Sequence, residues 1–102
     1  MKLALCVPGD GEVPAHFAHD LARLVGYLAA TRPDLGIRVL ASVGAPSPEQ
    51  RDALLKTARE WGADLTVFPD PEQRFPADAI DALIDRVASE PPKSRIIVPG
   101  GN

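Results

Sequence analysis

"LALCV", residues 3–7, is the stretch from which the fold of this chain can be predicted, because it is continuously apolar over five residues. A strand with one exposed face alternates apolar and polar side chains, whereas a strand covered on both faces is apolar throughout. We therefore expect residues 3–7 to form a parallel strand between two layers of helices. The run is also far shorter than a signal peptide or a membrane span requires.

Apolar runs of this kind alternate with helical patterns along the rest of the chain. We expect strands at residues 3–7, 37–40, 65–68 and 96–98, helices at residues 15–31 and 48–61, and a third helix whose apolar stripe covers residues 80–87. Strands joined by helices run parallel and are connected by right-handed crossovers. The sequence thus predicts a single α/β domain over residues 1–102, with a three-layer α/β/α arrangement and a mainly parallel, Rossmann-like sheet.

The start of the second helix is predicted by "APSPEQ", residues 45–50. Ser47 is a favourable N-cap, Pro48 suits the first helical position, and Gln50 completes the spacing of a capping box. Gly62 is expected to end this helix.

The composition excludes some classes of function. The chain of 102 residues is 45% hydrophobic and has a net charge of −3, with basic residues scattered among acids. We therefore expect no binding to duplex nucleic acid, which requires a basic surface. Cys6, the single cysteine, is expected to be a buried structural thiol. No segment directs the chain out of the cytoplasm, where we expect it to reside.

Ligands of an open parallel sheet bind beyond the carboxyl ends of its strands. The segments that follow the expected strands are rich in glycine and proline: "VPGDGEVP", "SVGAPSPEQ", "VFPDPEQRFP" and "VPGGN". In the first of them, Gly9-Asp10-Gly11 suggests a dinucleotide-binding loop, but Pro14 occupies the position of the third glycine of that fingerprint. A flexible turn is favoured, although backbone N–H groups at the helix start could still contact a nucleotide.

His16 and His19 are three residues apart on the first expected helix, with Asp20 four after His16. This spacing can bind a metal, but no cysteine or third histidine completes a zinc site. We expect these three side chains to lie on the surface and to stabilise the helix. A solvated surface is also expected for three acids on one face of the third helix, Asp78, Asp81 and Asp85.

Asp70 and Glu72 follow the third expected strand and flank Pro71. Carboxylates two residues apart on such a loop can converge on one hard cation, and Pro71 fixes the backbone between them. Two carboxylates alone bind Mg²⁺ or Mn²⁺ weakly, so a diphosphate would have to supply further oxygen ligands. The alternative is a β-turn of the kind that proline and aspartate favour.

The segment that holds these acids, "GADLTVFPDPEQRFPADAIDALI" (62–84), resembles the region around the DxD motif of GT-A-fold glycosyltransferases, especially the family-2-like kind. "RDALLKTAREWGAD" (51–64) resembles the helix with an Arg-Asn pair that precedes this strand in those proteins. "LALCVPGDGEVPAHFAHDLARLV" (3–25) resembles their first strand, nucleotide loop and helix. The resemblance covers nearly the whole chain in order and spacing.

This resemblance implies that the chain binds a nucleoside diphosphate or nucleotide sugar together with Mn²⁺ or Mg²⁺. Asp70 and Glu72 would be the first and last carboxylates of the DxD-like element and would hold the metal. In the family the last acid usually ligates the metal, and the first reaches the ribose or the metal's water. The residues that the resemblance places beside the nucleotide are Pro8, Gly9, Asp10, Arg51 and Asp70.

The chain also departs from the family's pattern. Glu72 stands where aspartate is usual, Pro71 replaces what is often a third acid, and Asp52 replaces the asparagine of the Arg-Asn pair. The chain stops at "IIVPGGN", near the middle of a complete transferase. The other half of such enzymes would carry the acceptor site and the general base, so transfer of a sugar would need a partner chain or a second copy.

Two other functions are compatible with the sequence. The first is a non-catalytic interaction module that forms a homodimer or binds another protein through an uncovered sheet edge. The second is a small nucleotide- or cofactor-binding protein of flavodoxin-like topology, which a first strand at the centre of the sheet, with no metal at Asp70, would favour.

Overall fold

The structure of the chain, a computed structural model, describes residues 1–44, 47–89 and 96–98. Its elements are β1 (Lys2–Val7), α1 (Ala15–Thr31), β2 (Gly36–Ala41), α2 (Pro48–Trp61), β3 (Leu65–Val67), α3 (Asp81–Ser89) and β4 (Ile96–Val98). Every element lies within two residues of the range expected from the sequence, because each is a distinct apolar run or helical stripe.

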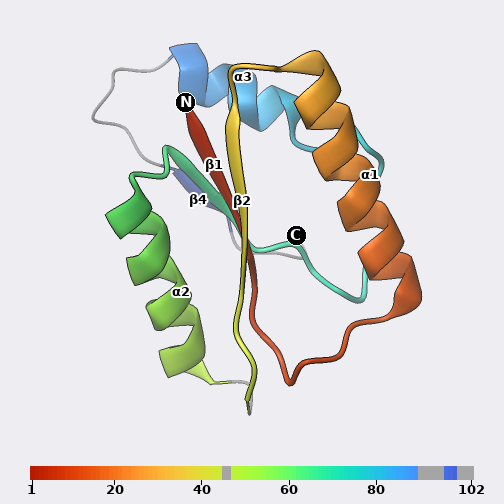
Figure 1. Ribbon diagram of the computed structural model, residues 1–102, viewed down its shortest axis with the longest axis vertical. Coiled ribbons are helices and arrows are strands. Elements are labelled where there is room, and N and C mark those ends of the chain that lie inside the picture. Colours follow the sequence, from red (N-terminus) through yellow and green to blue (C-terminus); the bar gives the residue numbers. More distant parts are fainter. Residues whose placement is uncertain (45–46, 90–95, 99–102) are drawn as a thin grey trace.

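The strands form one parallel sheet in the order β2-β1-β3-β4 (Figure 1). The α/β class with a parallel sheet is thereby confirmed. From β1 the chain moves to β2 on one side, then crosses back over β1 to β3 on the other side. The direction of winding therefore reverses between β1 and β3, which makes this pair the topological switch point of the sheet.

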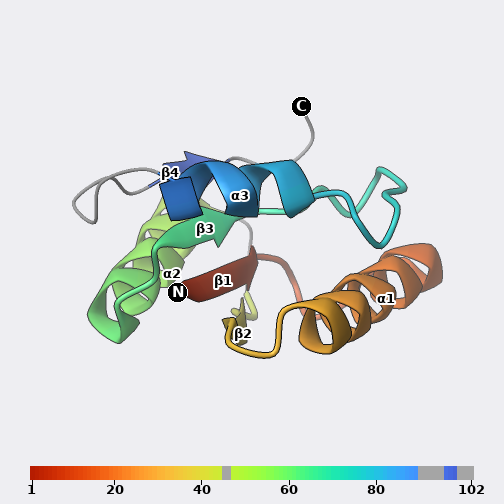
Figure 2. The same cartoon turned by 90° about the horizontal axis from the view of Figure 1, so that it is seen from above.

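Both faces of β1 are covered, as the continuous apolar run predicted. Leu3 and Leu5 pack with residues of α1 and α3, while Ala4 and Cys6 pack with residues of α2. All four side chains are fully buried. Because successive side chains of a strand point to opposite faces, α1 and α2 lie on opposite sides of the sheet (Figure 2).

The ends of α2 follow the residues that the sequence singled out. Ser47 Oγ accepts a hydrogen bond from Gln50 N at 3.2 Å, and Gly62 takes the left-handed conformation with φ of 89°. Only half of the expected capping box forms, because the Gln50 side chain donates to Gly9 O at 3.0 Å. This bond already connects α2 to the loop that follows β1.

Trp61, the last residue of α2, lies at the amino edge of the sheet. Its ring is 5.4 Å from Lys2 Nζ and 4.7 Å from the guanidinium carbon of Arg38, both measured to the ring centroid. These contacts join the end of α2 to the starts of β1 and β2. Among the helices of the described ranges, none has the length and apolar character needed to cross a membrane.

Candidate functional site

Three loops leave the sheet at the same level. Val7 of β1 pairs with Ala41 of β2, and Leu5 of β1 pairs with Val67 of β3. Continuing the first register by one residue pairs Pro8 with Ser42, and β3 ends at Val67, three residues before Asp70. A hydrogen bond from Ser42 N to Val7 O, 3.3 Å long, supports the pairing of Pro8 with Ser42. The loops after β1, β2 and β3 thus share one edge, which includes the switch point where α/β sheets bind ligands.

Backbone contacts hold the loop after β1 against the loop after β2. The carbonyl oxygen of Gly9 accepts hydrogen bonds from Gly44 N at 3.1 Å and from Gln50 Nε2 at 3.0 Å. Two polar atoms near these contacts, Ser42 Oγ and Gln50 Oε1, are buried and have no hydrogen-bond partner within the described residues. Buried polar atoms nearly always have a partner, so both are candidates for bonding to water or to a ligand.

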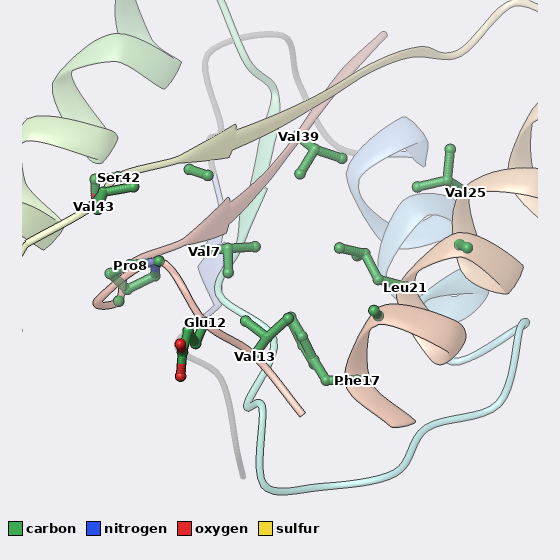
Figure 3. Close-up of a pocket in the computed structure, with 15 residues that line it drawn as sticks. Val7, Pro8, Glu12, Val13, Phe17, Leu21, Val25, Val39, Ser42 and Val43 are labelled. Atoms are coloured by element: carbon green, nitrogen blue, oxygen red, sulfur yellow. The ribbon is translucent and has the colours of Figure 1, made fainter. Parts of the chain in front are cut away.

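A pocket of about 510 Å³ opens between α1 and the carboxyl half of β2 (Figure 3). Its walls are the loop after β1 and the apolar side chains of α1 and β2, including Pro8, Gly9, Phe17, Leu21, Val25 and Val39. Glu12 and Ser42 are the polar side chains that line it. Its volume lies in the usual range for small-molecule sites, roughly 300–1,000 Å³.

The pocket exists because α1 leaves the outer part of β2 uncovered. Val39 is 47% exposed and Val43 is 77% exposed, although both are large apolar residues. Leu21 and Val25 of α1 are half-buried, because they pack against the core and also line the pocket.

The acids after β3 form a turn. Asp70 Oδ1 accepts a hydrogen bond from Glu72 N at 2.8 Å, and Asp70 O accepts one from Gln73 N at 3.2 Å. The loop after β1 repeats this geometry, since Asp10 Oδ1 accepts from Glu12 N at 3.1 Å. The β-turn that the sequence suggested is therefore present, and one oxygen of Asp70 is already bonded to the backbone.

The same acids were predicted to hold a metal. Within residues 1–44, 47–89 and 96–98, no three or more His, Cys, Asp or Glu side chains form a group that could hold a metal ion. Asp70 and Glu72 carry hard oxygen ligands that suit Mn²⁺ or Mg²⁺, but they number two. The metal site stays a prediction that requires further oxygens from a ligand.

The first two turns of α1 hold the loop after β3. Asp20 accepts hydrogen bonds from Arg74 Nε at 2.7 Å, from Arg74 Nη2 at 3.0 Å and from Phe75 N at 3.2 Å. His16 Nε2 lies 3.0 Å from Pro71 O, and since a carbonyl oxygen can only accept, His16 donates. The hydrogen bond from Arg74 lowers the pKa of Asp20 from 3.8 to about 2, against the opposing effect of burial.

The expectation of a surface position is therefore wrong for Asp20, whereas His16 is half-buried and His19 is exposed as expected. The side chain of Asp20 is 1% exposed, while that of its partner Arg74 is 64% exposed. One signal in the sequence could have indicated this: Asp20 is three residues after Phe17 and four before Leu24, at the margin of the apolar stripe. Its partner, 54 residues away, leaves no local signal.

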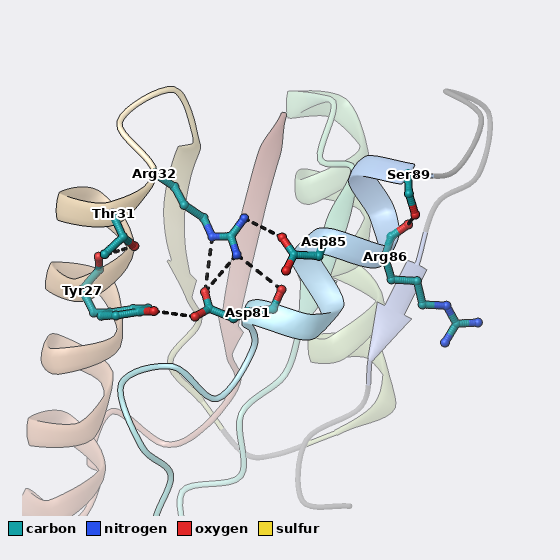
Figure 4. A network of polar contacts seen from close by, with 7 residues as sticks. All are labelled: Tyr27, Thr31, Arg32, Asp81, Asp85, Arg86 and Ser89. Carbon is teal, nitrogen blue, oxygen red and sulfur yellow. Dashed lines mark hydrogen bonds and ion pairs between the residues drawn. The ribbon is translucent and has the colours of Figure 1, made fainter.

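A second polar cluster lies at the opposite edge of the sheet, where α1 ends and β2 begins (Figure 4). Asp81 accepts from Tyr27 Oη at 2.5 Å and from Arg32 Nη2 at 3.1 Å, and Arg32 Nη1 is 3.0 Å from Asp85 Oδ1. The hydrogen bond from Tyr27, followed by that from Arg32, lowers the pKa of Asp81. Asp81 was expected on a solvated face, but its side chain is 27% exposed and bonded to α1. The cluster joins α1 to α3 away from the candidate site.

Cys6 is buried, as predicted, beneath α2. Burial raises the pKa of its thiol to about 11, with the charge of Arg51 opposing the rise. A buried, un-ionised thiol is a poor nucleophile, which is compatible with the structural role expected for Cys6.

The residues predicted to contact a nucleotide are distributed over the carboxyl edge. Pro8 and Gly9 line the pocket, whereas Asp10 is exposed in the loop beside it. Arg51 lies on the α2 side, with its guanidinium carbon 4.3 Å from the centroid of the Phe68 ring. Asp70 lies in the loop after β3. Neither Asp70 nor Arg51 lines the pocket.

Comparison of the chain with protein-family models, with curated proteins and with solved structures finds no match.

Proposed function

We propose that the chain binds a nucleoside diphosphate or a nucleotide sugar at the carboxyl edge of its sheet, as a domain resembling the nucleotide-binding half of a GT-A, family-2-like glycosyltransferase. One observation carries this proposal. The loops with Pro8, Gly9 and Asp10 and with Asp70 and Glu72 leave adjacent strands at the topological switch point. The helices on both faces of the sheet support the finer assignment of a three-layer, Rossmann-like domain.

The pocket between α1 and β2 suits the base of the nucleotide. Its walls are apolar, and Pro8 and Gly9, which the resemblance places by the base and ribose, form part of them. Glu12 and Ser42 are the polar residues among those that line the pocket. A few polar groups in an apolar pocket are typical of sites that select one orientation of a ring.

The start of α1 suits the phosphates. Pro14 precedes α1 and no side chain caps its first turn. The first backbone N–H groups of a helix carry partial positive charge and attract anions. No acidic residue lies in this first turn to compete with a phosphate.

Asp70 and Glu72 would hold the divalent cation together with diphosphate oxygens. When bound, Mn²⁺ or Mg²⁺ would neutralise the negative charge of the diphosphate. Oxygen ligands from both the protein and the phosphates are the usual arrangement for Mg²⁺ in nucleotide sites.

Calorimetric titration of the protein with UDP and GDP in the presence of Mn²⁺ tests this proposal. We expect measurable binding by the wild-type chain, and a loss of at least roughly tenfold in affinity for Asp70→Ala, because removing even an outer-shell partner of a metal costs that much. Asp78→Ala is the matched control, since Asp78 is an exposed acid outside the loop of Asp70. Absence of heat with either nucleotide, or equal loss in both variants, would contradict the proposal.

The strand order also favours a second candidate, a small nucleotide- or cofactor-binding protein of flavodoxin-like topology. The order β2-β1-β3-β4 is that of the first four strands of this topology, with β1 inside the sheet. The two candidates differ in their need for a cation. Binding that persists unchanged after EDTA treatment would favour the second.

The exposed edge of β2 favours the other alternative, a non-catalytic interaction module. We propose that such a module forms a homodimer. β2 is at one end of the sheet, and Val39 on it is 47% exposed. Unpaired edge strands readily pair with other chains. Light scattering is expected to give twice the mass of the monomer at high concentration. A strict monomer at every concentration rules out the homodimer.

A further inference from the structure

The connection between β3 and α3 runs alongside α1 (Figure 1, teal). Pro71 contacts His16 in the first turn of α1, and Phe75 contacts Asp20 in the second. The turn that presents Asp70 and Glu72 therefore rests on α1 and is not a free loop. Residues 70–76 are called the acidic loop below.

We propose that Asp20 is the positioning residue of the acidic loop, and that it sets the affinity of the site for a metal-bound nucleotide by fixing where Arg74 and Phe75 lie. The effect on affinity rests on the proposed function. The effect on the acidic loop does not, because it follows from contacts within the chain.

Because Asp20 is buried, its need for hydrogen-bond donors strongly constrains the conformation of the acidic loop. A carboxylate that is 1% exposed needs hydrogen bonds, because an unpaired buried charge is very unfavourable. Three donors satisfy it, and all three come from Arg74 and Phe75. The nearby Phe75 ring packs edge-on against Phe17, with 6.1 Å between the ring centroids. The observed arrangement of the acidic loop satisfies both the buried charge and the packing of Phe75.

The turn at residues 70–73 connects the residues bonded to Asp20 with Asp70 and Glu72. Asp70 Oδ1 and Asp70 O accept from the next amides, Glu72 N and Gln73 N, so residues 70–73 form one compact turn. Arg74 follows that turn directly and is bonded through two nitrogens, which fixes direction as well as distance. His16 holds the middle of the turn through Pro71 O. The backbone of the acidic loop is therefore held at Pro71 and at Phe75, and the carboxylate of Asp70 is bonded within the turn.

If Asp20 had a purely structural role, its loss would lower thermal stability without a specific effect on nucleotide affinity. Asp81 serves as the comparison for such a role. Asp81 is also a carboxylate that accepts a hydrogen bond from an arginine, Arg32. It differs from Asp20 in lying at the amino edge of the sheet, away from the candidate site. Loss of either carboxylate is expected to reduce thermal stability. Of the two losses, only that of Asp20 should change the affinity for a nucleotide and the hydrogen exchange of the acidic loop.

The experiment compares four variants with the wild type: Asp20→Asn, Arg74→Ala, Arg74→Lys and Asp81→Asn. Affinity for UDP with Mn²⁺ is measured by calorimetry, and hydrogen exchange at the backbone amides of Glu72, Gln73 and Phe75 is measured without nucleotide. We expect Asp20→Asn and Arg74→Ala to weaken binding by roughly 10–100-fold, the usual effect of losing a second-shell partner. Arg74→Lys, which keeps the charge but not the paired N–H groups, should recover part of the affinity. Asp81→Asn should leave the affinity within about twofold.

Each outcome decides the proposal. Faster exchange of the Glu72 and Gln73 amides in Arg74→Ala supports it, and unchanged exchange overturns it, whether or not the wild type binds a nucleotide. Wild-type affinity in Asp20→Asn and Arg74→Ala overturns the claim about the site. If the wild type binds no nucleotide, the proposed function fails, and exchange alone decides whether Asp20 positions the acidic loop. Arg74→Lys keeps a cation beside the buried carboxylate of Asp20, so it is the variant that stays informative if Asp20→Asn or Arg74→Ala does not fold.

Discussion

Leu5→Ala is expected to lower the free energy of unfolding by about 2–5 kcal/mol, the range for leucine truncation in a packed core. Leu5 is fully buried in the centre of the sheet and packs with residues of α1 and α3, including Leu24 and Ile84. Small domains have total stabilities of roughly 5–15 kcal/mol, so one truncation removes a large fraction. Urea unfolding followed by far-ultraviolet circular dichroism measures the change.

Val39→Ala is the matched control for Leu5→Ala. Val39 is the register partner of Leu5 on β2, on the same side of the sheet, but it is 47% exposed. Its truncation removes less buried surface and should cost under about 1 kcal/mol. Equal losses in the two variants would show that α1 covers β2 as fully as it covers β1, contrary to the open pocket.

Between about pH 4 and pH 2, the stability difference between the wild type and Asp20→Asn is expected to disappear. The pKa of Asp20 is about 2 in the folded chain, against an ordinary value of 3.8, because Arg74 donates hydrogen bonds to it. A carboxyl whose pKa is lower in the folded state adds stability above its ordinary pKa, and this is lost as the pH falls through the folded value. At pH 7 we expect the variant to unfold at a temperature lower by on the order of 10 °C, as for loss of a buried ionic network.

The measurement is thermal unfolding of both chains at several pH values from 7 to 2. Asp81 also has a lowered pKa, so the wild type loses further stability in acid. That contribution is common to both chains and cancels in their difference. Asp52→Asn, a change at an exposed position of α2, should follow the wild type throughout. A gap between wild type and Asp20→Asn that stays constant down to pH 2 would contradict the ionic role of Asp20.

The parts of the fold that follow from local pattern could be predicted from the sequence. The run of residues 3–7 indicated a strand with both faces covered, and Ser47 and Gly62 marked the ends of α2. These signals are local because they depend on side-chain periodicity and on backbone conformations that few residues favour. The β-turn at Asp70 is also a local feature and was recognised as one of two alternatives.

Contacts between distant segments could not be predicted in the same way. Asp20 meets Arg74 across 54 residues, and Asp81 meets Arg32 across 49. An acid on a helix is usually solvated, so without tertiary information the surface was the reasonable expectation for both. The pocket was missed for a related reason. Leu21 and Val25 belong to the apolar stripe of α1, and the stripe does not reveal that part of it extends past the edge of the packed sheet.

Trp61 is the single tryptophan of the chain, so the intrinsic emission of the protein comes mainly from one ring. That ring contacts Lys2 and Arg38 at the amino edge of the sheet, whereas the acidic loop lies at the carboxyl edge. A nucleotide at the carboxyl edge has no direct contact through which to quench it. A shift of the spectrum on ligand addition would therefore report a movement relayed through the length of β1 and α2, and a silent spectrum would be compatible with full occupancy.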